Sequence, residues 1–142
     1  MTVDRIKKHL LSDSSYVEKI GTKGSGNTQF QNPYGVCSDG IYVYIADSTN
    51  HRIKKHLLSD LSFVSAFGTY GTGNDNFDTP TQICTDKTHL YIVDSGNVRI
   101  KKHLCSDLSY VAQTGDLFNS YTPIIMCTDG THIYAFQKAY GT

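Results

Sequence analysis

The sequence has no tryptophan, only three prolines and few charged residues. Charged side chains make up 18% of the 142 residues, against about 25% in an ordinary soluble domain. Lys plus Arg balance Asp plus Glu at 13 each, so the net charge gives no reason to expect nucleic acid or an anionic membrane as a partner. No run approaches the roughly 18 apolar residues of a membrane span, and no apolar signal core follows Met1. We therefore expect a cytoplasmic protein with no membrane partner.

Closely paired cysteines are also absent. None of the four cysteines belongs to a Cys-x-x-Cys pair, which removes the commonest signature of a zinc site or a redox motif. Cys37, Cys84 and Cys127 occupy one position of a sequence repeat, and a buried cysteine behaves as a small apolar residue. We expect core cysteines, no metal and no other cofactor; two disulfides are the alternative.

Repetition dominates what the sequence does contain. The hexapeptide Arg-Ile-Lys-Lys-His-Leu begins at Arg5, Arg52 and Arg99, so successive copies are 47 residues apart. A constant period of this size is typical of stacked supersecondary units. Within each period, four short runs of strand-forming residues are separated by Asp, Asn, Ser and Gly. The pattern predicts an all-β protein without helices, built of four-stranded antiparallel units such as the blades of a β-propeller.

Residues 33–53 resemble the NHL repeat, a family of β-propeller blades. Pro-x-Gly-Val-x-x-Asp-Gly is followed by Tyr-x-Ala-Asp-Ser-x-Asn-His-Arg-Ile, and a Phe-Gly pair closes the repeat at Gly68. Residues 97–100 keep this motif without its histidine, and residues 137–142 have lost the Asp-Ser-x-Asn string. The resemblance implies a β-propeller of NHL-like blades. It implies no single function, because members of one fold family do unrelated jobs.

The predicted strands are out of phase with whole blades. If the strands are called a to d from the axis outwards, residues 1–21 supply strands c and d, and residues 116–142 supply strands a and b. Residues 22–68 and 69–115 each supply one blade. Three blades' worth of strands cannot close a propeller, which usually has about four to eight blades, whereas two chains would give six, a number that the NHL family uses. We expect a cyclic homodimer; a fragment of a longer propeller and an open monomer are the alternatives.

In this dimer, strands c and d of one copy would complete the blade begun by strands a and b of the other, because unpaired strand edges invite pairing. The residues expected in this clasp are Ile6, Lys8, Leu10, Tyr16, Val17, Ile133, Tyr134 and Phe136.

A second candidate surface is the rim that carries the d-to-a and b-to-c connections, the face that propellers usually present to ligands. A protein or peptide ligand is expected there. Its Gly-rich loops superficially match a phosphate-binding loop, but no predicted helix follows to supply aligned amides. The candidate binding residues on this top face are Lys23, Asn27, Asn50, His51, Tyr70, Asn74, Asn97 and Arg99.

Each hexapeptide places two lysines and a histidine on a predicted strand. Because side chains alternate along a strand, Lys54 and His56 share one face and Lys55 lies on the other. We interpret both as solvated faces, with lysines that guard a sheet against edge-to-edge aggregation. Binding of RNA or another polyanion is the alternative, and it requires the lysines of neighbouring strands to form one continuous basic surface.

Aspartates recur at the end of strand a, at Asp39, Asp86 and Asp129. A carboxylate at such a position can accept hydrogen bonds from the amides of its own turn, and this is the role we expect. A ring of carboxylates that binds a hard cation is the alternative. Asp47 and Asp94 are likewise expected to form turns between strands b and c.

No catalytic constellation is visible. Some NHL-like enzymes are zinc lyases with histidines at the axis, and zinc requires three or more protein ligands around an open position. No histidine falls on a predicted strand a, and no Gly-x-Ser-x-Gly motif is present. The favoured function is a non-catalytic repeat scaffold or binding module that assembles with itself, and copies this similar also fit an engineered or recently amplified sequence. Binding of RNA or a polyanion is second, and a metal-dependent lyase or hydrolase is third.

Overall fold

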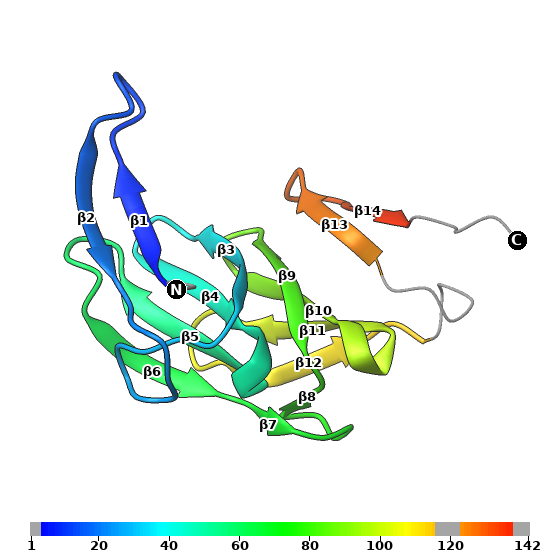
Figure 1. The fold of residues 1–142 in the computed structure, drawn as a ribbon. Helices are drawn as coiled ribbons and strands as arrows, with labels where there is room; N and C mark the ends of the chain where they lie inside the picture. The colour runs from blue at the N-terminus through cyan, green and yellow to red at the C-terminus, as the bar shows by residue number, and fades with distance from the viewer. Residues whose placement is uncertain (1–3, 116–122, 138–142) are drawn as a thin grey trace, which may run out of the picture.

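The computed structural model describes residues 4–115 and 123–137, which form β-sheets and two single-turn 3-10 helices (Figure 1). The all-β class predicted from the sequence is confirmed, as is the antiparallel pairing of the principal strands. In the described part of the chain, no helix is long and apolar enough to cross a membrane.

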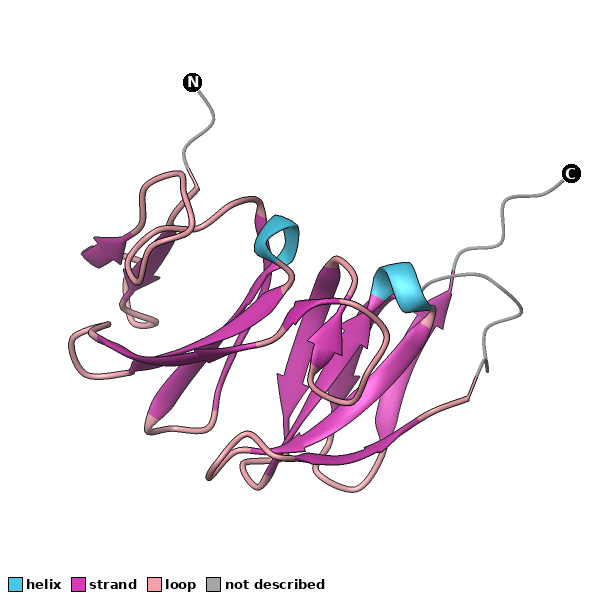
Figure 2. Ribbon diagram, turned by 90° about the horizontal axis from the view of Figure 1, so that it is seen from below, coloured by secondary structure: helices cyan, strands magenta, loops and turns pink. Residues whose placement is uncertain are grey.

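Two four-stranded antiparallel sheets form the centre of the molecule, and in each the strand order follows the sequence. The first contains β3 (Pro33–Ser38), β4 (Tyr42–Asp47), β5 (Arg52–Leu57) and β6 (Phe63–Phe67). The second contains β9 (Pro80–Thr85), β10 (His89–Asp94), β11 (Arg99–Leu104) and β12 (Tyr110–Gln113). Figure 2 shows the two sheets packed side by side. Each corresponds to one predicted four-stranded unit.

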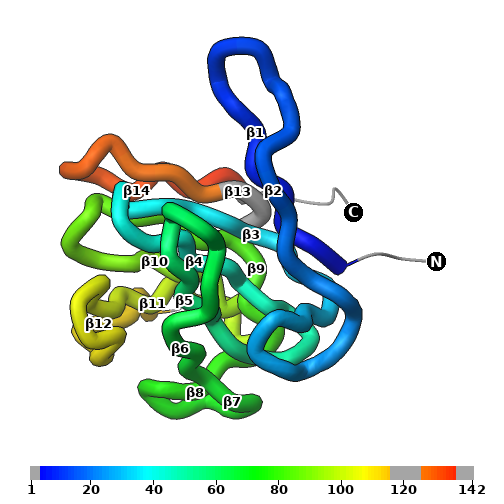
Figure 3. Tube along the Cα trace, turned by 90° about the vertical axis from the view of Figure 1, so that its left-hand side faces the viewer, coloured from blue at the N-terminus to red at the C-terminus, as the bar shows by residue number. Residues whose placement is uncertain are grey.

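Two-stranded sheets lie at opposite ends of this central pair (Figure 1). One is β1 (Ile6–His9) with β2 (Tyr16–Ile20), and the other is β13 (Pro123–Thr128) with β14 (Ile133–Gln137). Figure 3 shows the β1–β2 hairpin projecting beyond the central sheets. A short parallel pair, β7 (Thr69–Tyr70) with β8 (Asn76–Phe77), lies in the Gly-rich segment between the central sheets and was not predicted.

The first strands of neighbouring sheets, β3, β9 and β13, lie side by side. Between β3 and β9 the approach is so close that a Cβ atom at Gly35 would collide with the backbone of Thr81. Only glycine therefore fits at this point of the contact.

Three apolar clusters fill the three junctions between neighbouring sheets, which accounts for the core. The first junction contains Phe30, Val43, Ile45 and Leu61, with Ile6, Ile20 and Leu58 at its edge. The central junction contains Tyr44, Ala46, Ile53, Phe77, Ile83, Leu90, Ile92 and Cys105. The third contains Cys84, Val93, Ile100 and Met126.

The connections from the second to the third strand of each central sheet were predicted as turns and form 3-10 helices, η1 (Ser48–Asn50) and η2 (Ser95–Asn97). Each ends in a residue of left-handed conformation, His51 at φ 53° and Val98 at φ 52°. Histidine occupies this region far more readily than a β-branched residue does. Val98 is therefore strained, and the loss of the motif histidine at this position has a conformational cost.

Replacing Val98 with Asn is expected to raise the free energy of unfolding by about 1 kcal/mol, because Asn tolerates the left-handed region. The matched control is Val111→Asn, which places the same change on strand β12. There it should lower stability by up to about 1 kcal/mol, because β-branched residues favour strands. Chemical denaturation measures both changes, and a loss of stability in both variants would contradict the strain at Val98.

Candidate functional site

Lys54 was expected on a solvated strand face but is fully buried. Its ammonium donates hydrogen bonds to the carbonyls of Gly26, Asn27 and Gln29 at 2.9, 2.7 and 2.6 Å, and lies 4.3 Å from the centre of the Phe30 ring. An ammonium has three N–H donors, so all three are used. Burial lowers the pKa of Lys54 to about 8, which leaves the group protonated at neutral pH.

The next copy repeats this arrangement. Lys101 is fully buried and donates to the carbonyls of Gly73, Asn74 and Asn76, and burial also lowers its pKa to about 8. The prediction of solvated faces is therefore wrong for the second and third hexapeptides. Only Lys7, the equivalent residue of the first hexapeptide, is exposed.

A buried aspartate joins several top-face candidates to the same Gly-rich loop. Asp47 accepts a hydrogen bond from Asn50 Nδ2 at 2.9 Å and one from Arg52 Nε at 2.8 Å. Asn50 also donates to the carbonyl of Gly24. Asp94, Asn97 and Arg99 repeat these contacts one period later, and Asn97 donates to the carbonyl of Gly71. The structure thus places Asn50, Asn97 and Arg99 in internal contacts that hold the loops.

The other top-face candidates are more accessible. Lys23, Asn27, Tyr70 and Asn74 are exposed. His51 Nδ1 accepts a hydrogen bond from the Thr79 amide, and its ring packs edge-on against Tyr70 at 4.9 Å. His51 and Tyr70 are therefore brought together, whereas the carbonyls of Asn27 and Asn74 face the buried lysines.

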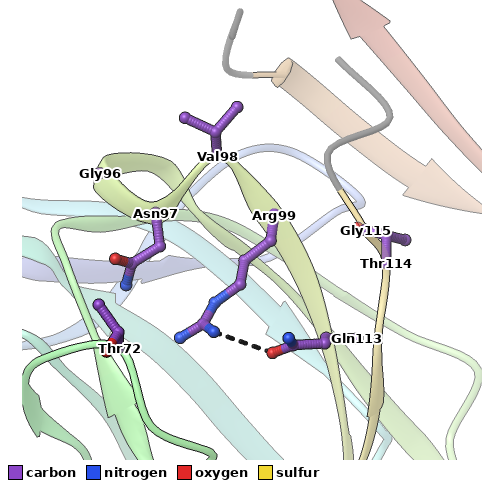
Figure 4. A pocket seen from close by; sticks show the side chains of 8 residues that line it. All are labelled: Thr72, Gly96, Asn97, Val98, Arg99, Gln113, Thr114 and Gly115. Carbon is purple, nitrogen blue, oxygen red and sulfur yellow. Dashed lines mark hydrogen bonds between the residues drawn. The ribbon is translucent and has the colours of Figure 1, made fainter. Parts of the chain in front are cut away.

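A cavity of about 430 Å³ opens beside Arg99 and is lined by Thr72, Asn97, Gln113 and Thr114 among others (Figure 4). The guanidinium of Arg99 is already bound to Asp94, to the Gly73 carbonyl and to Gln113 Oε1. In the preceding copy, Tyr70 packs against His51, which is the equivalent of Val98 at the edge of this cavity. The residues that follow Gly115 lie outside the described part of the chain, so this cavity is no candidate ligand site.

The aspartates at the end of the first strand of each sheet bind their own turns, as predicted. Asp39 accepts hydrogen bonds from the amides of Ile41 and Tyr42 at 2.8 and 2.7 Å and from the Tyr44 hydroxyl at 2.8 Å. Asp86 and Asp129 make the equivalent contacts. Across the described residues, no group of three or more His, Cys, Asp or Glu side chains could hold a metal ion.

All four cysteines are free thiols, so the disulfide alternative is wrong. Cys84 and Cys105 are buried, Cys37 is half-buried and Cys127 is exposed. Burial raises the pKa of Cys84 to about 11. A thiol held in its neutral form is a poor nucleophile.

The histidines of the second and third hexapeptides are buried between aromatic rings. His56 packs against Phe30 and Phe63, and its Nδ1 donates to the Leu61 carbonyl at 2.8 Å. His103 makes the same bond to Leu108. Nε2 of both rings is buried and has no hydrogen-bond partner among the described residues. Burial lowers the pKa of both histidines.

Residues near the two ends of the molecule are exposed where the interior copies bury them, and sequence reasoning missed several of these residues. Val36 is 53% exposed, whereas Ile83 and Met126, at the same repeat position, are 3% and 5% exposed. Tyr134 is 54% exposed and its equivalent Tyr44 is fully buried. A comparison of equivalent positions in the three copies identifies this surface. Six of the eight predicted clasp residues are exposed: Leu10, Tyr16, Val17, Ile133, Tyr134 and Phe136.

Cavities lie where each end sheet meets its four-stranded neighbour. One of about 520 Å³ lies beside β1 and is lined by Ile6, Val36, Val43, Leu58 and Leu61 among others. A smaller one of about 190 Å³ is lined mainly by Tyr91, Ile100, Lys102 and Ile133. Within the described residues, β1 pairs only with β2 and β14 only with β13. Each end sheet therefore has a free strand edge beside an apolar hollow.

Of the two remaining clasp residues, Ile6 packs against the cluster of the first junction. Lys8 binds Glu18 at 2.9 Å and the carbonyls of Leu58 and Ser59, both at 2.9 Å. The predicted clasp residues therefore lie on or beside the strands of two separate end sheets, and Lys8 already has partners within the chain.

Replacing Lys54 with Met is expected to lower the free energy of unfolding by about 2–4 kcal/mol, because it leaves three carbonyls without their donor. The matched control is Lys7→Met, the same change at the exposed equivalent position, which should alter stability by less than about 0.5 kcal/mol. Urea denaturation measures both. Equal effects would contradict the burial of Lys54.

Stability is expected to fall as the pH drops below about 6.5, the pKa of an unperturbed imidazole. Because the folded-state pKa of His56 and His103 is lowered, protons bind the unfolded chain preferentially in this range, and the stability present at higher pH is lost. Denaturation between about pH 5 and pH 7 tests this. The double variant His56→Phe/His103→Phe should lose the dependence, whereas His132→Phe, at an exposed residue, should keep it.

Comparison with known proteins gives no family assignment. No family model matches the sequence, and no curated protein matches it. Solved structures are similar, 34 chains in all. One is the crystal structure of a protein from Bacteroides fragilis NCTC 9343 whose name describes it as exported, with a TM-score of 0.59 and 13% sequence identity. The match covers 73% of this chain but only 29% of that one. At this identity the similarity shows a shared fold and nothing about function.

Proposed function

We propose that this chain is a non-catalytic assembly module, an NHL-like β-propeller whose ring is completed by a second copy of itself. The observation that carries the proposal is the pair of complementary end sheets. One end sheet corresponds to the third and fourth strands of a central sheet, and the other to the first and second strands. Together they have the composition of one more four-stranded sheet.

The repeat specifies how the two end sheets would pair. In the central sheets, Tyr44 lies opposite Lys55, and Tyr91 lies opposite Lys102. The equivalent residues of the end sheets are Tyr134 on β14 and Lys8 on β1. In the proposed composite sheet, Tyr134 of one copy therefore lies opposite Lys8 of the other.

This pairing also accounts for the apolar surface at both ends. By the same register, Phe136 of one copy lies opposite Ile6 of the other, and β13–β14 packs over the cavity lined by Val36 and Val43. Burial of such surface is favourable by about 25 cal/mol for each Å² removed from water. Two composite sheets and four central sheets give a six-bladed ring with a two-fold axis. Its role would be that of a scaffold presenting the exposed loop residues to a protein or peptide ligand.

The RNA or polyanion alternative lacks the observation that it requires. Lys54, Lys55 and Lys101 are buried, and their ammonium groups bind carbonyls. The hexapeptide strands therefore present no continuous basic surface in the described residues. No specific feature favours this function over assembly.

The proposal predicts a solution mass near twice 15.8 kDa by light scattering, and a melting temperature that rises with protein concentration. A charge at Phe136, which is 59% exposed within one chain, would be buried in the composite sheet. Phe136→Asp should therefore raise the dimer dissociation constant by at least about tenfold, because burying an unpaired carboxylate is costly.

The control is Val64→Asp, which introduces the same charge at an exposed residue of β6, a strand that belongs to neither end sheet. It should leave the dissociation constant unchanged. A wild-type mass near 15.8 kDa at all concentrations would contradict the proposal, and would indicate that strands of a longer chain cover the end sheets instead.

A further inference from the structure

A lysine connects each sheet to the next one along the chain. Lys8, on β1, donates to the carbonyls of Leu58 and Ser59, both at 2.9 Å. One period later, Lys55 donates to the carbonyls of Cys105 and Ser106 at 2.8 and 3.4 Å. In both cases the acceptors belong to the turn that joins the third and fourth strands of the following sheet.

The third lysine of this series, Lys102, has no such acceptor. It makes no hydrogen bond through its ammonium to any described residue of the chain. The group is nevertheless placed as in the preceding copy, because Lys102 Nζ lies 5.5 Å from the centre of the Tyr91 ring, and Lys55 Nζ lies 5.7 Å from the ring of Tyr44. The sheet that follows Lys102 consists of β13 and β14, which correspond to first and second strands only.

The turn between β1 and β2 is the equivalent of the turns that accept Lys8 and Lys55, but no lysine of the described residues binds it. In residues 10–15 the backbone closes by hydrogen bonds from Leu10 N to Ser15 O and from Ser14 N to Leu10 O, both at 3.0 Å. The turns after Leu57 and Leu104 close by the same two bonds, so this turn already has the shape that accepts a lysine. The carbonyls of Leu11 and Ser12 receive no hydrogen bond from the described residues.

The side chain beside these carbonyls is also uncovered. Leu11 is 103% exposed, whereas Cys105 at the same repeat position is 5% exposed and Leu58 packs against the first apolar cluster. The described chain thus carries one lysine of the series without acceptors and one turn of the series without a donor.

We propose that Lys102 of one copy donates to the carbonyls of Leu11 and Ser12 of a second copy, and so joins the two chains at each end. This inference rests on the proposed function, since the turn reaches Lys102 only when β1 and β2 of the second copy complete the sheet begun by β13 and β14. It adds the polar contact that fixes the second copy against the neighbouring sheet. A symmetric dimer contains this contact twice.

The test compares dimer dissociation constants by analytical ultracentrifugation. Lys102→Met removes the donor and should raise the constant by at least about tenfold, because a hydrogen bond from a charged donor is lost at both ends. Lys102→Arg keeps a charged donor and should restore much of the affinity. Lys23→Met, at an exposed lysine, controls for the change in net charge and should have no effect. Circular dichroism confirms that each variant is folded.

Acylation of lysines in the unmodified protein tests the contact directly. Lys102 should react readily in dilute, monomeric samples and be protected in concentrated, dimeric ones, while Lys23 reacts equally in both. If the wild type is a dimer and Lys102→Met dissociates at the same concentration, the lysine contact is overturned while the strand pairing stands. If the wild type is a monomer at all concentrations, both proposals fail.

Discussion

The structure depends on lysine ammonium groups that bind backbone carbonyls between the sheets. Turns and Gly-rich loops leave carbonyls without partners, and a buried carbonyl needs a donor. The two adjacent lysines of the hexapeptide meet this need in opposite directions, because neighbouring residues of a strand face opposite sides. Lys54 binds the loop that precedes its sheet, and Lys55 binds the turn of the sheet that follows. Each repeat is thus tied to both neighbours by side chains of one short strand.

The buried histidine of the hexapeptide completes this arrangement. His56 lies between the rings of Phe30 and Phe63, while Lys54 lies over the Phe30 ring. A cation above a ring face is attracted by the ring quadrupole, whereas a second cation at His56 would be repelled by Lys54. The lysine therefore favours the neutral imidazole, and the lowered pKa of His56 has Lys54 as one of its causes after burial. A basic sequence is thereby packed into an apolar junction.

The period and the turn residues were sufficient to predict the all-β class and the order of the four antiparallel strands in each central sheet. Burial of Lys54 could not be predicted in the same way. Lysine is almost never buried unless it is paired, and its partners are carbonyls, which every residue has and no side chain reveals. The exposed end surface was also only partly predicted, because Val36 and Leu11 stand out only when their burial is compared with that of their equivalents.

The two ends of the repeat array expose side chains that the interior repeats bury. In an open array each repeat contacts only its neighbours, and the terminal repeats need a polar outer face to remain soluble. Exposed apolar and aromatic residues lie at both ends of this molecule instead: Val36, Leu11 and Tyr134 are exposed, whereas their equivalents Ile83, Cys105 and Tyr44 are buried. Their surfaces carry interior chemistry, including a turn shaped to accept a lysine. A chain with interior chemistry at both ends is suited to a closed ring, in which every sheet has two neighbours and no cap is needed.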